Sequence, residues 1–157
     1  MTHPRILGID PGLTGGLALL CGDALLAVAM PALTLNGRGE INLAEFRAIL
    51  GQWAPTHAWI EKQQAMPRQG VSSSFRTGQN YGDLRGFLTA SLIPWHEVRP
   101  AAWKKAMGVP ADKAAAIAFA TRMYPAYSHL WSLKKHDGIA EAALIAAYGQ
   151  RQQCTQP

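Results

Sequence analysis

Cysteine is scarce in this chain: only Cys21 and Cys154 occur, and they lie far apart in the sequence. Two such residues argue against a disulfide-stapled secreted domain and against a cysteine-based zinc site. Long apolar runs are missing too, because the longest, residues 15–21 and 24–32, are too short to span a bilayer. The first ten residues lack the basic-then-apolar pattern of a signal peptide. We therefore expect a soluble protein of a reducing, intracellular compartment with no membrane partner.

Several common cofactor and nucleophile motifs are also missing. The chain has no Gly-x-Gly-x-x-Gly and no Gly-Lys-Ser/Thr, which argues against a dinucleotide-binding fold and a P-loop. It has no His-Glu-x-x-His and no Gly-x-Ser-x-Gly, which argues against a zinc protease and a serine hydrolase of the common types. We therefore expect no small-molecule cofactor.

The composition is that of a folded, basic domain. The 157 residues suit a single domain, which we place at residues 1–150 and follow with a flexible tail at 151–157. Apolar residues make up 48% of the chain, so a packed core is expected. The 15 Lys and Arg residues outnumber the 10 Asp and Glu residues, which gives a formal net charge of +5. A basic surface favours a polyanionic partner.

The hydrophobic patterns predict an α/β protein with a central mixed five-stranded sheet flanked by helices. Residues 5–10, 15–20 and 24–30 have the pattern of three antiparallel strands, and Pro11-Gly12 forms the first turn. Asn42 is placed to cap a helix. The other expected segments are a loop at 35–38, a strand at 57–61, a mobile loop at 63–74, a helix at 75–92, a strand at 95–98, and helices at 112–124 and 137–149.

Four of the ten acidic residues do not lie where solvated charge is the default. Asp10 and Glu61 each end an apolar strand. Asp137 and Glu141 lie four residues apart at the start of an apolar helix, and therefore share one face of it. Half-buried carboxylates repel one another unless a cation compensates their charge. Oxygen ligands without His or Cys favour Mg²⁺ or Mn²⁺, and two such ions ~3.5–4 Å apart are the usual apparatus for cutting a phosphodiester.

Each acid has an ordinary interpretation when it is taken singly. Asp10 before Pro-Gly is typical of a turn residue, and Glu61 is typical of a strand-edge charge. Asp137 near a helix start is favoured by the helix dipole. The combination of two strand-end acids with an acidic pair on one helix face is what indicates a metal site.

Four segments in fixed order carry a further signal. They are Gly8-Ile-Asp-Pro-Gly12 with Gly15-Gly16, the stretch from Ile60 to Phe75 with Gly82-Asp-Leu-Arg-Gly86, Pro100-Ala-Ala-Trp-Lys-Lys105 with Asp112-Lys113, and Lys135-His-Asp-Gly-Ile-Ala-Glu-Ala-Ala-Leu144. This set, which covers roughly residues 5–148, resembles the RuvC-type Holliday junction resolvases of the RNase H-like superfamily. The resemblance is greatest to the phage-type branch. The first segment alone also resembles sugar-kinase-like ATPases, whereas the ordered set is much more specific.

The resemblance implies an RNase H-like fold and a homodimer that makes paired, symmetric nicks in a four-way DNA junction. It implies a role in DNA recombination and repair, in the cytoplasm of a bacterial or phage-infected cell. Its four acidic positions, which serve as catalytic residues and metal ligands, match Asp10, Glu61, Asp137 and Glu141, with Mg²⁺ as the ion and Mn²⁺ as a substitute. Some relatives have His in the third position, so His136 is a further candidate ligand or proton donor. Its ordinary interpretation is a helix-entry residue.

Basic residues are concentrated in one part of the chain. Eight basic residues but only three acidic ones lie from Lys62 to Lys113. The candidate DNA contacts are Lys62, Met66, Arg68, Arg76, Lys104, Lys105 and Lys113. The resemblance implies that Lys104 and Lys113 hold phosphates beside the active site, while a solvated basic face is the ordinary alternative. It also implies an apolar wedge on the loop after the strand at 57–61. Met66 is the candidate, because Phe75 is better explained as a core anchor.

Small residues recur every four positions on the long helix, at Gly78, Gly82, Gly86 and Ala90. Such a stripe allows another element to approach closely. That element is either the sheet of the same chain or a partner helix across a two-fold axis.

Two other functions stay open from the sequence. One is an RNase H-like nuclease that acts on RNA or an RNA–DNA hybrid, because its metal chemistry is the same. The other is a non-catalytic nucleic-acid-binding module of the same fold, against which the presence of all four acids argues. The short chain argues against a sugar-kinase-type ATPase.

Overall fold

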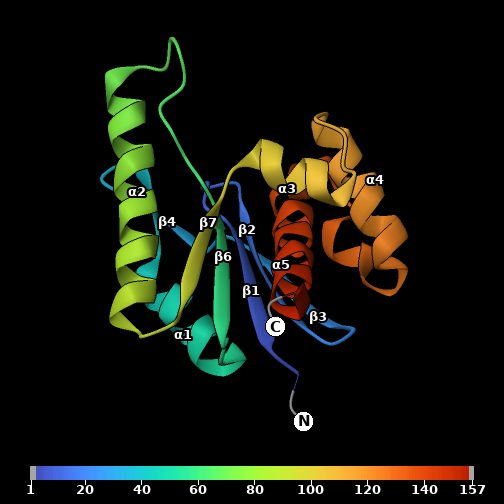
Figure 1. Cartoon of the computed structure of the whole chain (residues 1–157). Helices are drawn as coiled ribbons and strands as arrows, with labels where there is room; N and C mark the ends of the chain where they lie inside the picture. Colours follow the sequence, from blue (N-terminus) through green and yellow to red (C-terminus); the bar gives the residue numbers. More distant parts are fainter. Residues whose placement is uncertain (1–2, 156–157) are drawn as a thin grey trace.

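The computed structural model describes residues 3–155, and its centre is a five-stranded mixed sheet (Figure 1). The strand order is β3-β2-β1-β6-β7. Three strands form an antiparallel meander, in which β2 (Gly16–Cys21) pairs with both β1 (Arg5–Asp10) and β3 (Ala24–Ala29). On the other side of β1, β6 (His57–Glu61) pairs parallel with β1, and β7 (Trp95–Val98) pairs parallel with β6. The α/β class, the mixed sheet and the antiparallel meander predicted from the sequence are confirmed.

Helices cover both faces of the sheet, and alternate strand residues supply two cores. Leu7, Ile9 and Leu17 pack with buried residues of α1 (Leu43–Trp53) and α2 (Val71–Ala90). Ala18 and Leu20 pack with α5 (Asp137–Thr155), together with residues of α3 (Pro100–Met107) and α4 (Lys113–Met123). Two short 3₁₀ segments, η1 (Pro125–Trp131) and η2 (Lys134–His136), connect α4 to α5. None of the helices in residues 3–155 is both long and apolar enough to cross a membrane.

A second, two-stranded sheet lies where the sequence patterns predicted only a loop. The strands β4 (Ala32–Leu35) and β5 (Arg38–Ile41) pair antiparallel across Asn36 and Gly37, which have φ of 50° and 74°. Asn-Gly with positive φ at both positions is the favoured two-residue hairpin turn. The loop predicted at 35–38 is therefore wrong in extent, because only its two central residues form the turn.

One helix differs from its predicted bounds and another was not predicted. α2 begins at Val71, so the loop after β6 ends at Gly70 and not at Ser74. Its N-cap is Gly70, which has no side chain to accept a capping hydrogen bond. The start of the helix therefore lacks the Ser, Thr, Asp or Asn that would predict it from the sequence. α3 begins at Pro100, where only the end of a strand was predicted. Proline is favoured at the first position of a helix, and Gly108 with φ of 74° ends this one.

The last helix, α5, continues beyond Gly149, where its end was predicted. Gly149 is a packing position, because a Cβ there would overlap the indole ring of Trp59. The side-chain amide of Gln150 then donates to the Gly22 carbonyl at 3.0 Å. Residues 151–155 are helical and residues 156–157 lie outside the described part of the chain, so the flexible tail at 151–157 stays a prediction.

Candidate active site

The four candidate acids lie at adjacent ends of three elements. Asp10 is the last residue of β1 and Glu61 the last residue of β6. Both lie at the same edge of the sheet, because β1 and β6 are parallel neighbours with Ile9 opposite Ile60. Asp137 begins α5 and Glu141 follows one helical turn later. Figure 1 shows α5 running beside β1 on one face of the sheet.

Glycines allow the start of α5 to touch the backbone of β1 and of the β1–β2 turn. A Cβ at Gly138 would overlap the carbonyl oxygen of Thr14, and one at Gly8 would overlap the carbonyl oxygen of Ala142. A larger residue at either position has to push the helix away from the sheet. This backbone contact is what brings the acidic face of α5 to the end of β1.

Gly138→Ala therefore tests whether this contact positions the acids. In the nuclease that the sequence resemblance implies, cutting should fall by about 100-fold, because a displacement of about 1 Å at a reacting centre has effects of that size. The measurement is single-turnover cleavage, with Gly51→Ala as the matched control because a Cβ at Gly51 meets nothing within 4 Å. Equal activities of the two variants would contradict the positioning role.

Burial and repulsion by other carboxylates set the protonation of Asp10. Its pKa is raised from 3.8 to about 8, first by burial and then by the negative charges of Glu61 and Glu141, with a smaller effect from Asp137. A hydrogen bond to the Gly12 backbone opposes the shift. All three other candidate acids thus raise the pKa of Asp10, so the four carboxyl groups lie close enough to interact electrostatically.

Two of the acids have partners on α3. Glu61 is only 8% exposed, and the indole of Trp103 donates to its Oε2 at 2.7 Å. Burial raises the pKa of Glu61, and this hydrogen bond opposes the rise. The Lys104 Nζ lies 2.7 Å from Glu141 Oε1, and both side chains are largely buried. Trp103 was not predicted as a site residue, although it lies inside the segment Pro100 to Lys105 that carried the resemblance.

The donor set fits a hard divalent cation in its chemistry. Its members are carboxylate oxygens, and Lys104 is the cation paired with one of them. As the side chains stand, no three His, Cys, Asp or Glu residues within 3–155 are grouped closely enough to hold an ion. Glu61 and Glu141 are instead held by Trp103 and Lys104.

His136 is the last residue of η2 and directly precedes Asp137. Its Nδ1 is buried and has no hydrogen-bond partner within the described residues. Buried ring nitrogens are usually paired, so this atom needs an explanation. A metal or proton-transfer role for His136 stays a prediction, as does its interpretation as a helix-entry residue.

Comparison with solved structures establishes what kind of fold carries this site. Thermus thermophilus RuvC in complex with a Holliday junction substrate matches with a TM-score of 0.60 and 18% identity, over 96% of this chain and 96% of that chain. The chain has a RuvC-like fold. The yeast mitochondrial Holliday junction resolvase Ydc2 matches with a TM-score of 0.57 and 14% identity, over 97% of this chain and 80% of that chain. No family model and no curated protein sequence matches the chain.

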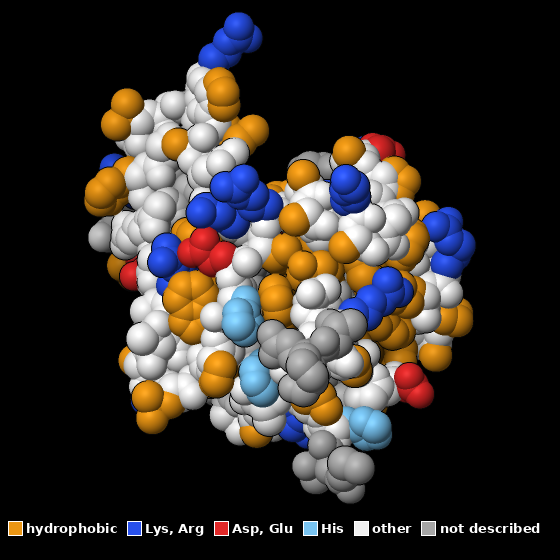
Figure 2. All heavy atoms as spheres, in the orientation of Figure 1, with side chains coloured by type: hydrophobic (Ala, Val, Ile, Leu, Met, Phe, Trp, Pro, Cys, Tyr) orange, Lys and Arg blue, Asp and Glu red, His pale blue; other side chains and the backbone are white. Residues whose placement is uncertain are grey.

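On this RuvC-like fold the predicted DNA-contact residues lie on several elements, and two of them, Lys62 and Lys104, adjoin candidate acids. In chain order, Lys62 follows β6, Met66 and Arg68 lie in the loop before α2, Arg76 lies on α2, and Lys104 and Lys105 lie on α3. Lys113 begins α4, but its side chain lies outside the described residues. Figure 2 shows Lys and Arg side chains gathered around the hollow between the α2 side and the α3 side of the molecule.

Glu97 differs from the solvated charge that the sequence predicted. It lies on β7 with its side chain 24% exposed, between Lys62 Nζ at 3.4 Å and Arg85 Nε at 3.3 Å. The Arg85 guanidinium also lies over the rings of Tyr81 and Trp95, with centroid distances of 5.3 and 5.1 Å. These contacts connect Lys62, the neighbour of Glu61, to helix α2. This network was not predictable from local sequence patterns, because its members are distant in the chain.

The loop before α2 has a defined turn. The Gln69 side chain accepts from the Met66 backbone amide at 3.0 Å and donates to Ser73 and Thr77 at 3.2 and 3.3 Å. The Met66 side chain is nevertheless 61% exposed. The Gln69 side chain therefore connects the backbone at Met66 to the first two turns of α2. This contact was not predicted.

The prediction that Phe75 anchors the core is wrong, because Phe75 is 72% exposed. The buried face of α2 includes Leu84, and nine residues make two and a half helical turns, so Phe75 points to the opposite side. A Cβ at Gly78, Gly82 or Gly86 meets nothing within 4 Å. These glycines therefore do not pack on the sheet, and their alternative interpretation as a partner surface stays a prediction.

Proposed function

We propose that this protein is a divalent-metal-dependent endodeoxyribonuclease that resolves four-way DNA junctions by paired, symmetric nicks. The RuvC-like fold supports the proposal, since the similar structures include RuvC with a Holliday junction substrate and a Holliday junction resolvase. The observation that carries it is that Asp10 and Glu61 end two neighbouring parallel strands, while Glu61 and Glu141 are both contacted by α3, through Trp103 and Lys104. A cation-binding site for phosphodiester hydrolysis gives such a cluster a use.

In this proposal Asp10, Glu61, Asp137 and Glu141 hold Mg²⁺, with Mn²⁺ as a substitute. When bound, the ions supply an activated water and stabilise the leaving 3′ oxygen. The chain's own part is positioning. Trp103 would orient Glu61 through its indole N–H, and the Lys104 ammonium beside Glu141 would bind the phosphate next to the cut.

The solvent-facing side of α2 is the proposed homodimer interface, because paired nicks need two sites related by a two-fold axis. Val71 and Phe75 are exposed beside the glycine stripe, so an apolar and closely approachable surface is available. Gly82→Leu should convert a dimer to a monomer at micromolar concentration in sedimentation velocity, while Gly51→Leu on α1 should not. A monomeric wild-type protein would overturn the interface.

Met66 is the proposed wedge that enters the junction centre. Met66→Ala should lower cleavage by about tenfold with binding changed less than twofold, because insertion acts on the distorted junction more than on its phosphates. Gln69→Ala should reproduce part of this loss, since it frees the turn that carries Met66. Leu35→Ala, an exposed apolar residue on β4, is the control. Unchanged cleavage by Met66→Ala would dismiss the wedge.

A substrate panel tests the function as a whole. The protein is given a four-way junction, a linear duplex and an RNA–DNA hybrid, each with Mg²⁺, Mn²⁺ or chelator. We expect symmetric paired nicks in the junction only, and none with chelator. Preferred cutting of the hybrid would select the alternative of an RNA-directed nuclease, and binding without cutting would select a non-catalytic module.

A further inference from the structure

Two clefts built from different elements each contain one of the candidate acids. The first, about 570 Å³, lies between the loop after β6 and the start of α3, and Glu61 lines it. The second, about 520 Å³, lies among the β1–β2 turn, α4, η2 and the start of α5, and Asp137 lines it. The acid cluster therefore connects with open space on the β6 side and on the α4 side.

The linings of the two clefts contain the same kinds of side chain. The first combines Glu61 with the cations Lys62 and Arg99 and with apolar surface from Met66 and Pro100. The second combines Asp137 with the exposed cations Lys134 and Lys135 and with apolar surface from Ala114 and Ile117. Each cleft thus has one acid of the cluster, two cations and apolar side chains. Cations for phosphates beside apolar surface for sugars and bases are what a single polynucleotide strand requires.

We infer that the second cleft holds the same DNA strand whose scissile phosphate lies at the acids, on the side of the cut opposite to the first cleft. The inference rests on the proposed function and extends it. Lys134 and Lys135 bind phosphates of this strand, and Ile117 and Ala114 contact its sugars or bases. The strand then runs from the Lys62–Arg99 cleft, past Asp10, into the Lys134–Lys135 cleft.

Charge favours a nucleic acid over a protein segment or a small ligand as the occupant. Lys134 and Lys135 are exposed and adjacent, and the lining has one acid, which belongs to the cluster that the metal ions would neutralise. The backbone contact of Gly138 with Thr14 makes the Asp137 end of the cleft a fixed part of the active site. An occupant of this cleft therefore lies directly beside the reacting phosphate.

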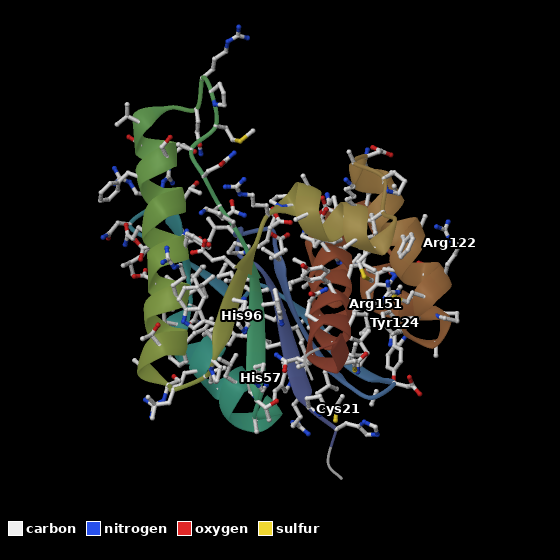
Figure 3. The ribbon with its side chains drawn as sticks, viewed as in Figure 1. Cys21, His57, His96, Arg122, Tyr124 and Arg151 are labelled. Atoms are coloured by element: carbon white, nitrogen blue, oxygen red, sulfur yellow. The ribbon has the colours of Figure 1, made fainter. Side chains whose placement is uncertain are left out.

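The experiment couples protein charges to individual phosphates. Junctions carry a neutral methylphosphonate at each of three positions on either side of the cut. Affinities are measured in Ca²⁺ for the wild type, for Lys134→Ala/Lys135→Ala and for Lys62→Ala. The matched control is Arg47→Ala/Arg122→Ala, which removes two exposed charges outside both clefts. Figure 3 shows Arg122 on the outer side of α4.

We expect the lysine pair to lower affinity about tenfold and to reduce the salt slope by about 1.8, or about 0.9 for each lost phosphate contact on a duplex arm. A methylphosphonate on one side of the cut should no longer lower the affinity of the Lys134/Lys135 variant. A methylphosphonate on the other side should no longer lower the affinity of Lys62→Ala. The inference is overturned if the lysine pair behaves like the control or couples to the same side as Lys62. Wild-type protein that cuts no junction overturns the proposed function itself, whereas normal cutting without lysine coupling overturns the cleft assignment alone.

Discussion

Asp10→Asn should abolish junction cutting while junction binding is retained. The amide keeps the shape of the carboxyl group but lacks the negative charge that a metal ligand supplies. It also removes the charge that Glu61, Glu141 and Asp137 repel. We expect the single-turnover rate with Mg²⁺ to fall by at least about 1,000-fold, which corresponds to a loss of about 4 kcal/mol in transition-state stabilisation. Affinity for the junction, measured with chelator, should stay within about threefold, because phosphate contacts by cations supply most of it.

Asp23→Asn, at an exposed turn between β2 and β3, is the control and should cut like the wild type. If Asp10→Asn retained a tenth or more of the activity, the assignment of Asp10 as a catalytic metal ligand would fail. Loss of binding in parallel with cutting would point to a damaged fold, which circular dichroism of the same sample distinguishes.

The metal-free protein should lose stability as the pH rises from about 4 to about 8. The Asp10 carboxyl has a folded-state pKa of about 8 against an unfolded value of 3.8, so between these values the folded state binds the additional proton. Its stability therefore falls with rising pH across this window, at a limiting slope of about 1.4 kcal/mol per pH unit for one proton. Stability should therefore be lower at pH 8 than at pH 5, by no more than this limiting slope allows over that interval.

Denaturant unfolding with chelator at pH 5 and pH 8 measures this loss. Asp10→Asn should flatten the pH dependence and be more stable than the wild type at pH 8, because it removes the repelled charge. Added Mg²⁺ should stabilise the wild type at pH 8 and leave Asp10→Asn unaffected, since a ligand that binds only the folded state stabilises it. A wild-type stability that is independent of both pH and Mg²⁺ would contradict the account.

Strand patterns and the positions of the acids were predictable, because both depend on local sequence. The alternation around Leu7 and Ile9 predicts a strand, and parallel pairing then brings its terminal Asp10 beside Glu61. The helical spacing of Asp137 and Glu141 predicts a shared face. The hairpin turn at Asn36-Gly37 was also encoded locally and was missed only because its flanking strands are four residues long.

Contacts between distant residues could not be predicted in this way. The Trp103 hydrogen bond to Glu61 and the Glu97 network depend on how α3 and α2 are placed against the sheet. Phe75 shows the same limit, since a hydrophobic residue at a helix start is ordinarily buried, but the face of α2 on which it lies is set by Leu84 and Leu88. The sequence thus indicates the candidate acids better than the residues that contact them.

Anomalous diffraction from crystals soaked in Mn²⁺ tests the central claim most directly. The account predicts a peak ligated by Asp10 and by at least two of Glu61, Asp137 and Glu141, with Glu141 turned away from Lys104, and predicts no such peak in Asp10→Asn. A protein that cuts junctions but binds Mn²⁺ elsewhere, or not at all at this cluster, would contradict it.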